Sequence, residues 1–253
     1  MNGSSTDGPQ TANGERIVVA NDVARRYGEG EAAVDALAGV STGFERGRFA
    51  AITGPSGSRK STLMHILAGL DRPDGGSVVL DGTDLAGLDD NRLTRIRRDK
   101  LGFVFQFFNL LPVLTAEENI RLPLSIAGRK PDPEWEKQLI EIVGLGDRRT
   151  HRPAELSGGQ QQRVAVARAL ISKPAVVFAD EPTGNLDSKS SEEVLDLLRH
   201  SVDELGQTVI MVTHEAHAAA YADRLVVLRD GQVAHDGVAG DENDVLELMK
   251  AVA

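Results

Sequence analysis

Short apolar runs alternate with longer amphipathic stretches along this chain, and polar residues follow the apolar runs directly. Three of the runs, 49–53, 175–179 and 208–212, have the near-continuous hydrophobicity of strands buried on both faces of a parallel sheet. Stretches with apolar residues at helical spacing lie between these runs. The alternation predicts an α/β fold built on a doubly wound parallel sheet, with its ligand at the carboxyl ends of the strands.

The rest of the pattern predicts additional elements around this sheet. We expect further strands at 17–27, 34–37, 77–80 and 101–106, a closing hairpin at 225–233, and helices at 190–205 and 244–250. From 115 to about 149 the apolar spacing is helical, and Pro112 and Pro153 bound this stretch. We interpret it as an inserted helical lobe. The basic run 94–100 is expected to form a solvated face.

The composition of the chain excludes several classes of protein. A chain of 253 residues fits one α/β domain with an inserted lobe, and the absence of cysteine excludes disulfides and thiolate chemistry. The formal net charge of −10 argues against a nucleic-acid partner. Residues 1–16 have no apolar core, so we expect a disordered tail and neither a signal peptide nor an anchor. No apolar run approaches the roughly 20 residues that span a bilayer. We therefore expect a cytoplasmic protein that reaches a membrane only through a partner.

A glycine- and serine-rich segment follows the first buried run and precedes a helical pattern. It consists of Gly54, Pro55, Ser56, Gly57, Ser58, Arg59, Lys60, Ser61 and Thr62. In a phosphate-binding loop of this form, backbone N–H groups surround the phosphates and the helix N-terminus adds positive potential. Lys60 would reach the β- and γ-phosphates, and the Ser61 hydroxyl would bind Mg²⁺. The segment taken alone is also compatible with a simple turn before a helix.

Arg59 departs from the phosphate-loop pattern, which has glycine at this position. Glycine adopts backbone angles that other residues avoid, and it lets the chain approach the phosphates closely. We therefore expect weak ATP binding and hydrolysis.

Polar residues follow two of the other buried runs. Asp180 and Glu181 come directly after 175–179, and His214 follows 208–212. Asp180 suits a magnesium carboxylate, Glu181 can accept a proton from an attacking water, and His214 can hold the γ-phosphate or that water. Each taken alone also fits a turn or a structural histidine. Tyr27, at the end of an early strand, can stack on a nucleotide base or pack as an ordinary strand-end tyrosine.

Five separated motifs give the chain a resemblance to the ATP-binding subunits of the ABC family. In chain order they are the phosphate loop, Gln106 as the glutamine loop, the signature Leu156, Ser157, Gly158, Gly159 and Gln160, the pair Asp180 and Glu181, and the switch histidine His214. The resemblance covers about 17–236, with a helical lobe at about 107–170; the tails 1–16 and 237–253 lie outside it. It implies a P-loop NTPase fold of the ABC type, with an antiparallel β subdomain.

The resemblance also implies cofactors, partners and roles. ATP and Mg²⁺ would be bound, with Gln106 acting at the metal and in catalysis, Tyr27 stacking on adenine, and Asp187 in the loop that crosses the dimer. The signature segment 157–160 would complete the ATP site of a second, likewise ATP-binding chain, most simply an identical copy. An integral membrane permease would hold the pair at the cytoplasmic face of the membrane.

The segment 107–112, together with 115–119 and 182–187, resembles the lipoprotein-release and macrolide-export branch of the family. Phe107, Phe108 and Leu110 fit either a contact with the permease or ordinary packing of the lobe. Two other functions remain open: a degenerate regulatory ATP-binding module, to which Arg59 points, and a soluble ABC ATPase of DNA repair or translation. The single cassette, without cysteines or a long heptad run, disfavours the last.

Overall fold

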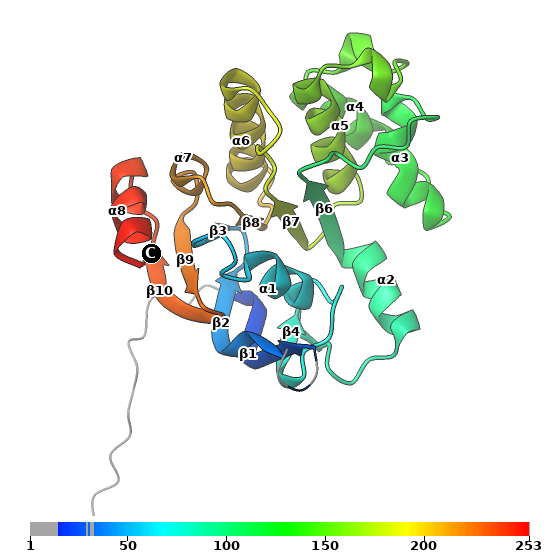
Figure 1. Cartoon of the computed structure of the whole chain (residues 1–253). Coiled ribbons are helices and arrows are strands. Elements are labelled where there is room, and N and C mark those ends of the chain that lie inside the picture. The colour runs from blue at the N-terminus through cyan, green and yellow to red at the C-terminus, as the bar shows by residue number, and fades with distance from the viewer. Residues whose placement is uncertain (1–14, 29, 31–32, 253) are drawn as a thin grey trace, which may run out of the picture.

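The computed structural model describes residues 15–28, 30 and 33–252 (Figure 1). The expected disordered tail lies mostly outside this range. A six-stranded sheet forms the centre, in the order β10-β9-β3-β8-β7-β6. Its strands are β3 (Phe49–Thr53), β6 (Leu101–Phe105), β7 (Val176–Asp180), β8 (Val209–Val212), β9 (Arg224–Arg229) and β10 (Gln232–Val238). All neighbours pair in parallel except β9 and β10, which form an antiparallel hairpin.

Strands β3, β7 and β8 confirm the prediction that three apolar runs form strands buried on both faces. Every residue of β3 and β8 is buried, and so are the first four of β7. Because these strands are parallel neighbours, their carboxyl ends lie at one edge of the sheet. The residues that follow β3, β7 and β8 are therefore brought together.

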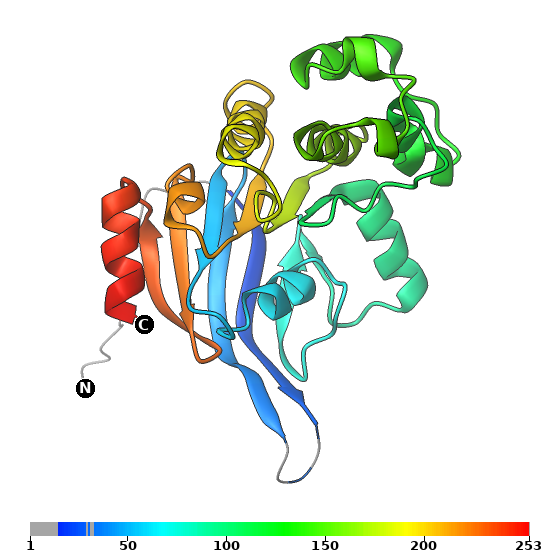
Figure 2. The same ribbon diagram turned by 45° about the horizontal axis from the view of Figure 1, so that its top comes forward.

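A second, antiparallel sheet has the order β2-β1-β4-β5. Its strands are β1 (Arg16–Tyr27), β2 (Val34–Glu45), β4 (Gly75–Leu80) and β5 (Thr83–Asp84). The predicted strand at 34–37 was too short, because β2 runs on to Glu45 and pairs with β1 along its length through several register shifts. The long β1–β2 ribbon projects from the body of the molecule in Figure 2.

Helices make up the remaining elements. They are α1 (Lys60–Leu67), α2 (Asp90–Lys100), α3 (Ala116–Ile126), α4 (Pro133–Ile142), α5 (Gly158–Leu170), α6 (Ser188–Asp203), α7 (Ala216–Ala219) and α8 (Glu242–Val252), and short 3₁₀ turns lie at Gly146–Arg148 and Pro153–Glu155. The helical stretch predicted at 115–149 is two helices, α3 and α4. Together with α5 they form the lobe beyond β6 in Figure 1. The basic run 94–100 is mostly exposed as expected, but it belongs to a helix, α2, that the pattern did not predict.

Two hydrophobic cores lie on opposite faces of the central sheet. One contains residues of α3, α4, α5, α6, α7 and α8, and the other lies between this sheet, α1 and the antiparallel sheet. Adjacent residues of one strand alternate between the two cores: Ala51 belongs to the first, and Ala50 and Ile52 to the second. The sheet is therefore covered by helices on one face and by α1 and a second sheet on the other, whereas a doubly wound fold has helices on both. Among the described residues, no helix has the length and apolarity that crossing a bilayer requires.

Candidate functional site

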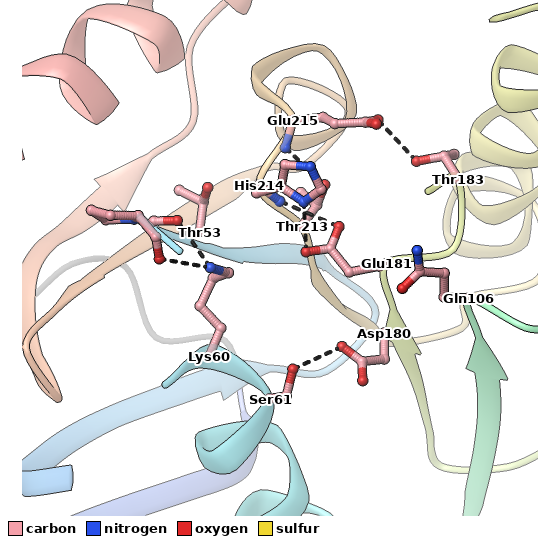
Figure 3. Close-up of polar contacts among 12 residues, drawn as sticks. Thr53, Lys60, Ser61, Gln106, Asp180, Glu181, Thr183, Thr213, His214 and Glu215 are labelled. Carbon is pink, nitrogen blue, oxygen red and sulfur yellow. Dashed lines mark hydrogen bonds and ion pairs between the residues drawn. The ribbon is translucent and has the colours of Figure 1, made fainter. Parts of the chain in front are cut away.

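A cleft of about 640 Å³ opens at the carboxyl ends of the central strands. It is lined by Gly54, Pro55, Ser56, Gly57, Arg59, Lys60, Ser61, Thr62, Glu181, His214 and Met249. The structure thus brings the phosphate-loop candidates together with Glu181 and His214, which lie far from them along the chain. Figure 3 shows Lys60, Ser61, Glu181 and His214 of this cleft together with neighbouring polar side chains.

The loop after β3 has the close-packed geometry that its glycines allow. A Cβ atom on Gly54 would lie 2.1 Å from the Leu228 carbonyl oxygen, so only glycine fits there. Ser58 is buried, and its hydroxyl oxygen has no hydrogen-bond partner among the described residues. Arg59 has φ 74° and ψ 27°, which is left-handed backbone, and its peptide precedes the first turn of α1. The position therefore has the conformation that glycine adopts most easily.

Lys60 lies across the loop with only 8% of its surface exposed. Its Nζ donates to the carbonyl oxygens of Gly54, at 2.9 Å, and Pro55, at 3.1 Å. Burial lowers the pKa of this ammonium group, while the nearby carboxylates of Glu181 and Asp180 act in the opposite direction. An anion in the cleft would stabilise the charged form that burial disfavours.

The Ser61 hydroxyl donates to Asp180 Oδ1 at 3.2 Å, joining the first turn of α1 to the end of β7. Burial raises the pKa of the Asp180 carboxyl, and the Ser61 hydrogen bond, His65 and Lys60 oppose that shift. A hydroxyl and a carboxylate are oxygen ligands of the kind that Mg²⁺ prefers, and a cation would offset the cost of the buried charge. These two side chains therefore fit a magnesium ion.

Glu181 and His214 form a pair beside Lys60. His214 Nδ1 lies 2.9 Å from Glu181 Oε1, and the His214 backbone N–H donates to Glu181 Oε2 at 3.4 Å. Glu181 has a positive φ of 46°, an uncommon conformation that turns the chain sharply at the end of β7. The Glu181 side chain is mostly buried, and that of His214 is mostly exposed.

Gln106 lies just beyond β6, at the side of this group in Figure 3. It forms two hydrogen bonds with Asn185. The Gln106 side chain donates from Nε2 to Asn185 Oδ1 at 3.3 Å, and Asn185 Nδ2 donates to the backbone carbonyl oxygen of Gln106 at 3.0 Å. Within the described chain it makes no hydrogen bond to Ser61 or Asp180. The magnesium contact of Gln106 stays a prediction.

The signature residues form a helix start. Ser157 caps α5 by accepting from the Gln160 N–H at 3.3 Å, and Gln160 Oε1 accepts from the Ser157 N–H at 2.9 Å. This confirms Ser157 as the N-cap. Gly159 lets α5 approach α6 closely, since a Cβ there would lie 2.6 Å from Ser190 Oγ. Ser190 N–H in turn donates to Asp187 at 3.0 Å and lowers the pKa of that carboxyl. The described residues lining the cleft include none of 157–160 and not Asp187.

Tyr27 lies outside the cleft lining and is 41% exposed. Its hydroxyl donates to Asp71 at 2.7 Å, and the Arg25 guanidinium lies 4.7 Å from the ring centroid. Arg25 also binds Asp71 and Asp74, at 3.1 and 2.9 Å, so the ring is fixed to the turn after α1. Both interpretations of Tyr27 remain compatible with this geometry.

The pattern of the sequence did not indicate two residues beside the site. Arg168 of α5 donates to the carbonyls of Asn109, at 2.5 Å, and Phe108, at 2.7 Å, and so holds the turn after Gln106; burial lowers its pKa. Met249 of α8 lines the cleft. Arginine and methionine are common residues of amphipathic helices, so nothing in the sequence indicated that these two lie at the site.

The fold and the cleft define a P-loop nucleoside triphosphatase, and comparisons with known proteins identify its family. Residues 37–184 match the ABC transporter family model. An uncharacterised ABC transporter ATP-binding protein of Thermotoga maritima is 49% identical over 221 residues, which cover 87% of this chain and 94% of that protein. The chain belongs to the ABC transporter family and is one of its ATP-hydrolysing cassettes.

Two further comparisons match the chain to part of a longer protein and to a cassette solved as a dimer. The macrolide export ATP-binding/permease protein MacB of Marinobacter nauticus is 48% identical over 222 residues; the match covers 87% of this chain but only 34% of that protein. The chain therefore spans about a third of the length of this relative. The cassette MJ0796 of Methanocaldococcus jannaschii, solved as a dimer in a post-hydrolysis state with ADP and Pi, has a TM-score of 0.79 and 42% identity, covering 88% of this chain and 99% of that chain.

Proposed function

We propose that this chain powers a membrane complex of the macrolide-export or lipoprotein-release type through ATP-driven pairing of two cassettes. The observation that carries the proposal is an incomplete cleft. Lys60, Ser61, Glu181 and His214 line one opening, and Asp180 accepts a hydrogen bond from Ser61. The signature helix start at Ser157 does not line that opening. A helix N-terminus is an anion site, so a second chain can supply it to the phosphates held by the first.

The residues of the cleft suit distinct steps of hydrolysis. Lys60 binds the β- and γ-phosphates, and Ser61 with Asp180 holds Mg²⁺, which neutralises phosphate charge when bound. Glu181 accepts a proton from the attacking water. His214 with protons on both ring nitrogens donates from Nδ1 to the Glu181 carboxylate and from Nε2 to a γ-phosphate oxygen. Loss of that phosphate removes contacts shared by the two chains and releases them.

Replacing Lys60 tests whether the cleft is the ATP site. Lys60→Ala removes the ammonium group, and losing one charge-assisted hydrogen bond to phosphate should weaken ATP affinity about tenfold to a hundredfold. Calorimetric titration with ATP and Mg²⁺ measures this change. Lys173→Ala is the matched control, since Lys173 pairs with Asp132 in the helical lobe, outside the cleft. Equal affinities for the two variants would place the nucleotide elsewhere.

We further propose that the permease docks on an apolar groove between the central sheet and the helical lobe. The groove has a volume of about 360 Å³ and is lined by apolar side chains of β6 and α3 and by arginines of α2 and α5. The apolar lining residues include Phe103, Phe105, Leu122 and Ile126, and the basic ones are Arg97, Arg98 and Arg168. Nearby, Phe107 and Val113 are 73% and 72% exposed. A short amphipathic helix of a membrane subunit, with an acidic residue for the arginines, fits this surface.

The docking proposal is best tested at exposed residues. Leu110, one of the residues that fit a permease contact, is half-buried and packs against the core, and Leu114 in the same apolar segment is also half-buried. A charge at either position would disturb folding. Ile126→Glu and Val113→Glu instead place a charge on an exposed apolar surface. We expect both to abolish co-purification with the membrane subunit while ATP affinity is kept. Val238→Glu, at an 81% exposed position on β10, is the control. Retention of the membrane subunit by both lobe variants would contradict the docking proposal.

A further inference from the structure

The last helix contributes a side chain to the nucleotide cleft. Met249 of α8 lines the same opening as Lys60, Glu181 and His214. Its Sδ accepts a hydrogen bond from Thr53 Oγ1 at 3.6 Å. Thr53 is fully buried at the end of β3, directly before Gly54, so α8 touches the point where the phosphate loop begins.

Helix α8 is also attached to the segment that carries His214. Val245 is fully buried, and Leu248 and Val252 pack against the same core. At its start, Glu242 Oε2 lies 3.0 Å from Nδ1 of His217, a residue of α7, which begins two residues after His214. Figure 1 shows α7 and α8 side by side at one edge of the sheet. One helix thus contacts both chain segments that flank the cleft on this side.

We propose that Met249 is a positioning residue of the ATP site, which it closes on the side of α8 while holding the end of β3 in place. The inference rests on the proposed function, because it takes the cleft to be occupied by ATP. The Gly54 carbonyl, one residue beyond Thr53, accepts from Lys60 Nζ at 2.9 Å. A shift of the chain at Thr53 would therefore move the Gly54 carbonyl oxygen, which accepts from Lys60 and orients it. A thioether suits this position because it is flexible, fills irregular space and accepts a weak hydrogen bond from a buried hydroxyl.

Oxidation of the methionine side chains can be used to test the proposal. Met64 and Met211 are fully buried, whereas Met249 is half-buried beside the open cleft. Hydrogen peroxide oxidises an accessible thioether by transferring one oxygen atom to sulfur, and the peroxide is reduced to water. Met249 should therefore be oxidised before Met64 and Met211, and nucleotide in the cleft should shield it.

The first experiment compares the rate of Met249 oxidation with and without ATP and Mg²⁺, read by peptide mass spectrometry. It is run on the chain with Arg59 and on the Arg59→Gly variant, with Met64 and Met211 as internal references. We expect saturating ATP to slow oxidation of Met249 several-fold and to leave the references unchanged. A parallel titration with a fluorescent ATP analogue separates two failures. Binding without protection of Met249 would overturn this inference, whereas absence of binding in both chains would overturn the proposed function.

The second experiment separates positioning from general stability. Met249→Ala removes both the wall of the cleft and the acceptor for Thr53, and we expect the KM for ATP to rise about two- to tenfold with a smaller change in kcat. Met249→Leu keeps the volume and should have the smaller effect. Leu246→Ala, on the 39% exposed outer face of the same helix, is the control and should leave KM unchanged. An unchanged KM in Met249→Ala, or an equal rise in Leu246→Ala, would overturn the assignment.

Discussion

Glu181→Gln should stop ATP hydrolysis while ATP still binds, and the variant should then accumulate as a nucleotide-held pair of chains. Glutamine matches glutamate in shape and can still contact His214, but it cannot take up a proton from water at neutral pH. Loss of a general base slows hydrolysis about 10²- to 10⁴-fold. Steady-state phosphate release measures the loss, and gel filtration with ATP and Mg²⁺ measures the pairing. The measurement is best made in the Arg59→Gly background, where binding is expected to be tighter.

Glu215→Gln is the matched control for this variant. Glu215 also follows β8, one residue after His214, but its carboxylate accepts from Thr183 Oγ1 at 3.1 Å and does not line the cleft. The same change of charge close by should leave hydrolysis within about twofold. A Glu181→Gln chain that binds ATP yet elutes as a monomer would contradict the paired-cassette mechanism, and one that still hydrolyses ATP would remove Glu181 as the base.

The sequence predicts the central part of this fold well because burial on both faces leaves a local signal. β3, β7 and β8 are nearly continuous apolar runs, and each delivers polar residues to one edge of the sheet. Ser157 was predictable as a cap for a similar reason, since capping depends on residues three positions apart.

Elements held by distant contacts left no such signal. β2 contains two glycines and two exposed polar residues, Asp35 and Ser41, and its pairing with β1 keeps it extended beyond residue 37. α2 buries only Leu93, so it lacks an apolar face that a helical period could reveal. Arg168 and Met249 reach carbonyl and hydroxyl groups about 60 and about 200 residues away along the chain. Their place at the site depends on tertiary packing, which no local spacing encodes.

Arg59 is the position at which the chain departs from the loop that its other motifs predict, and the structure shows why this matters. Its backbone is left-handed, which costs a residue with a Cβ about 1–2 kcal/mol and costs glycine little. The loop keeps its shape around Lys60 despite that strain. The Arg59 side chain is exposed and lines the cleft.

Two effects of this side chain on ATP oppose each other. Attraction between the exposed guanidinium and phosphate returns about 0–1 kcal/mol. Displacement of the phosphates from the loop would weaken several backbone N–H contacts at once, each about 1.5–3 kcal/mol when the acceptor is charged. The steric loss outweighs the attraction, so we expect the chain as written to bind and hydrolyse ATP weakly.

Arg59→Gly should therefore raise kcat/KM for ATP at least about tenfold, the change that corresponds to roughly 1.4 kcal/mol. Steady-state ATPase assays and ATP titrations of the two chains measure it. Arg59→Ala identifies the cause, because alanine removes the long side chain and its charge but keeps the Cβ in left-handed backbone. If the alanine variant matches the glycine variant, the bulk of arginine is the obstacle; if it remains as weak as the chain with Arg59, the backbone conformation is. Equal activity of the chain as written and of Arg59→Gly would show that the loop accommodates arginine around the phosphates, and the steric argument would then be wrong.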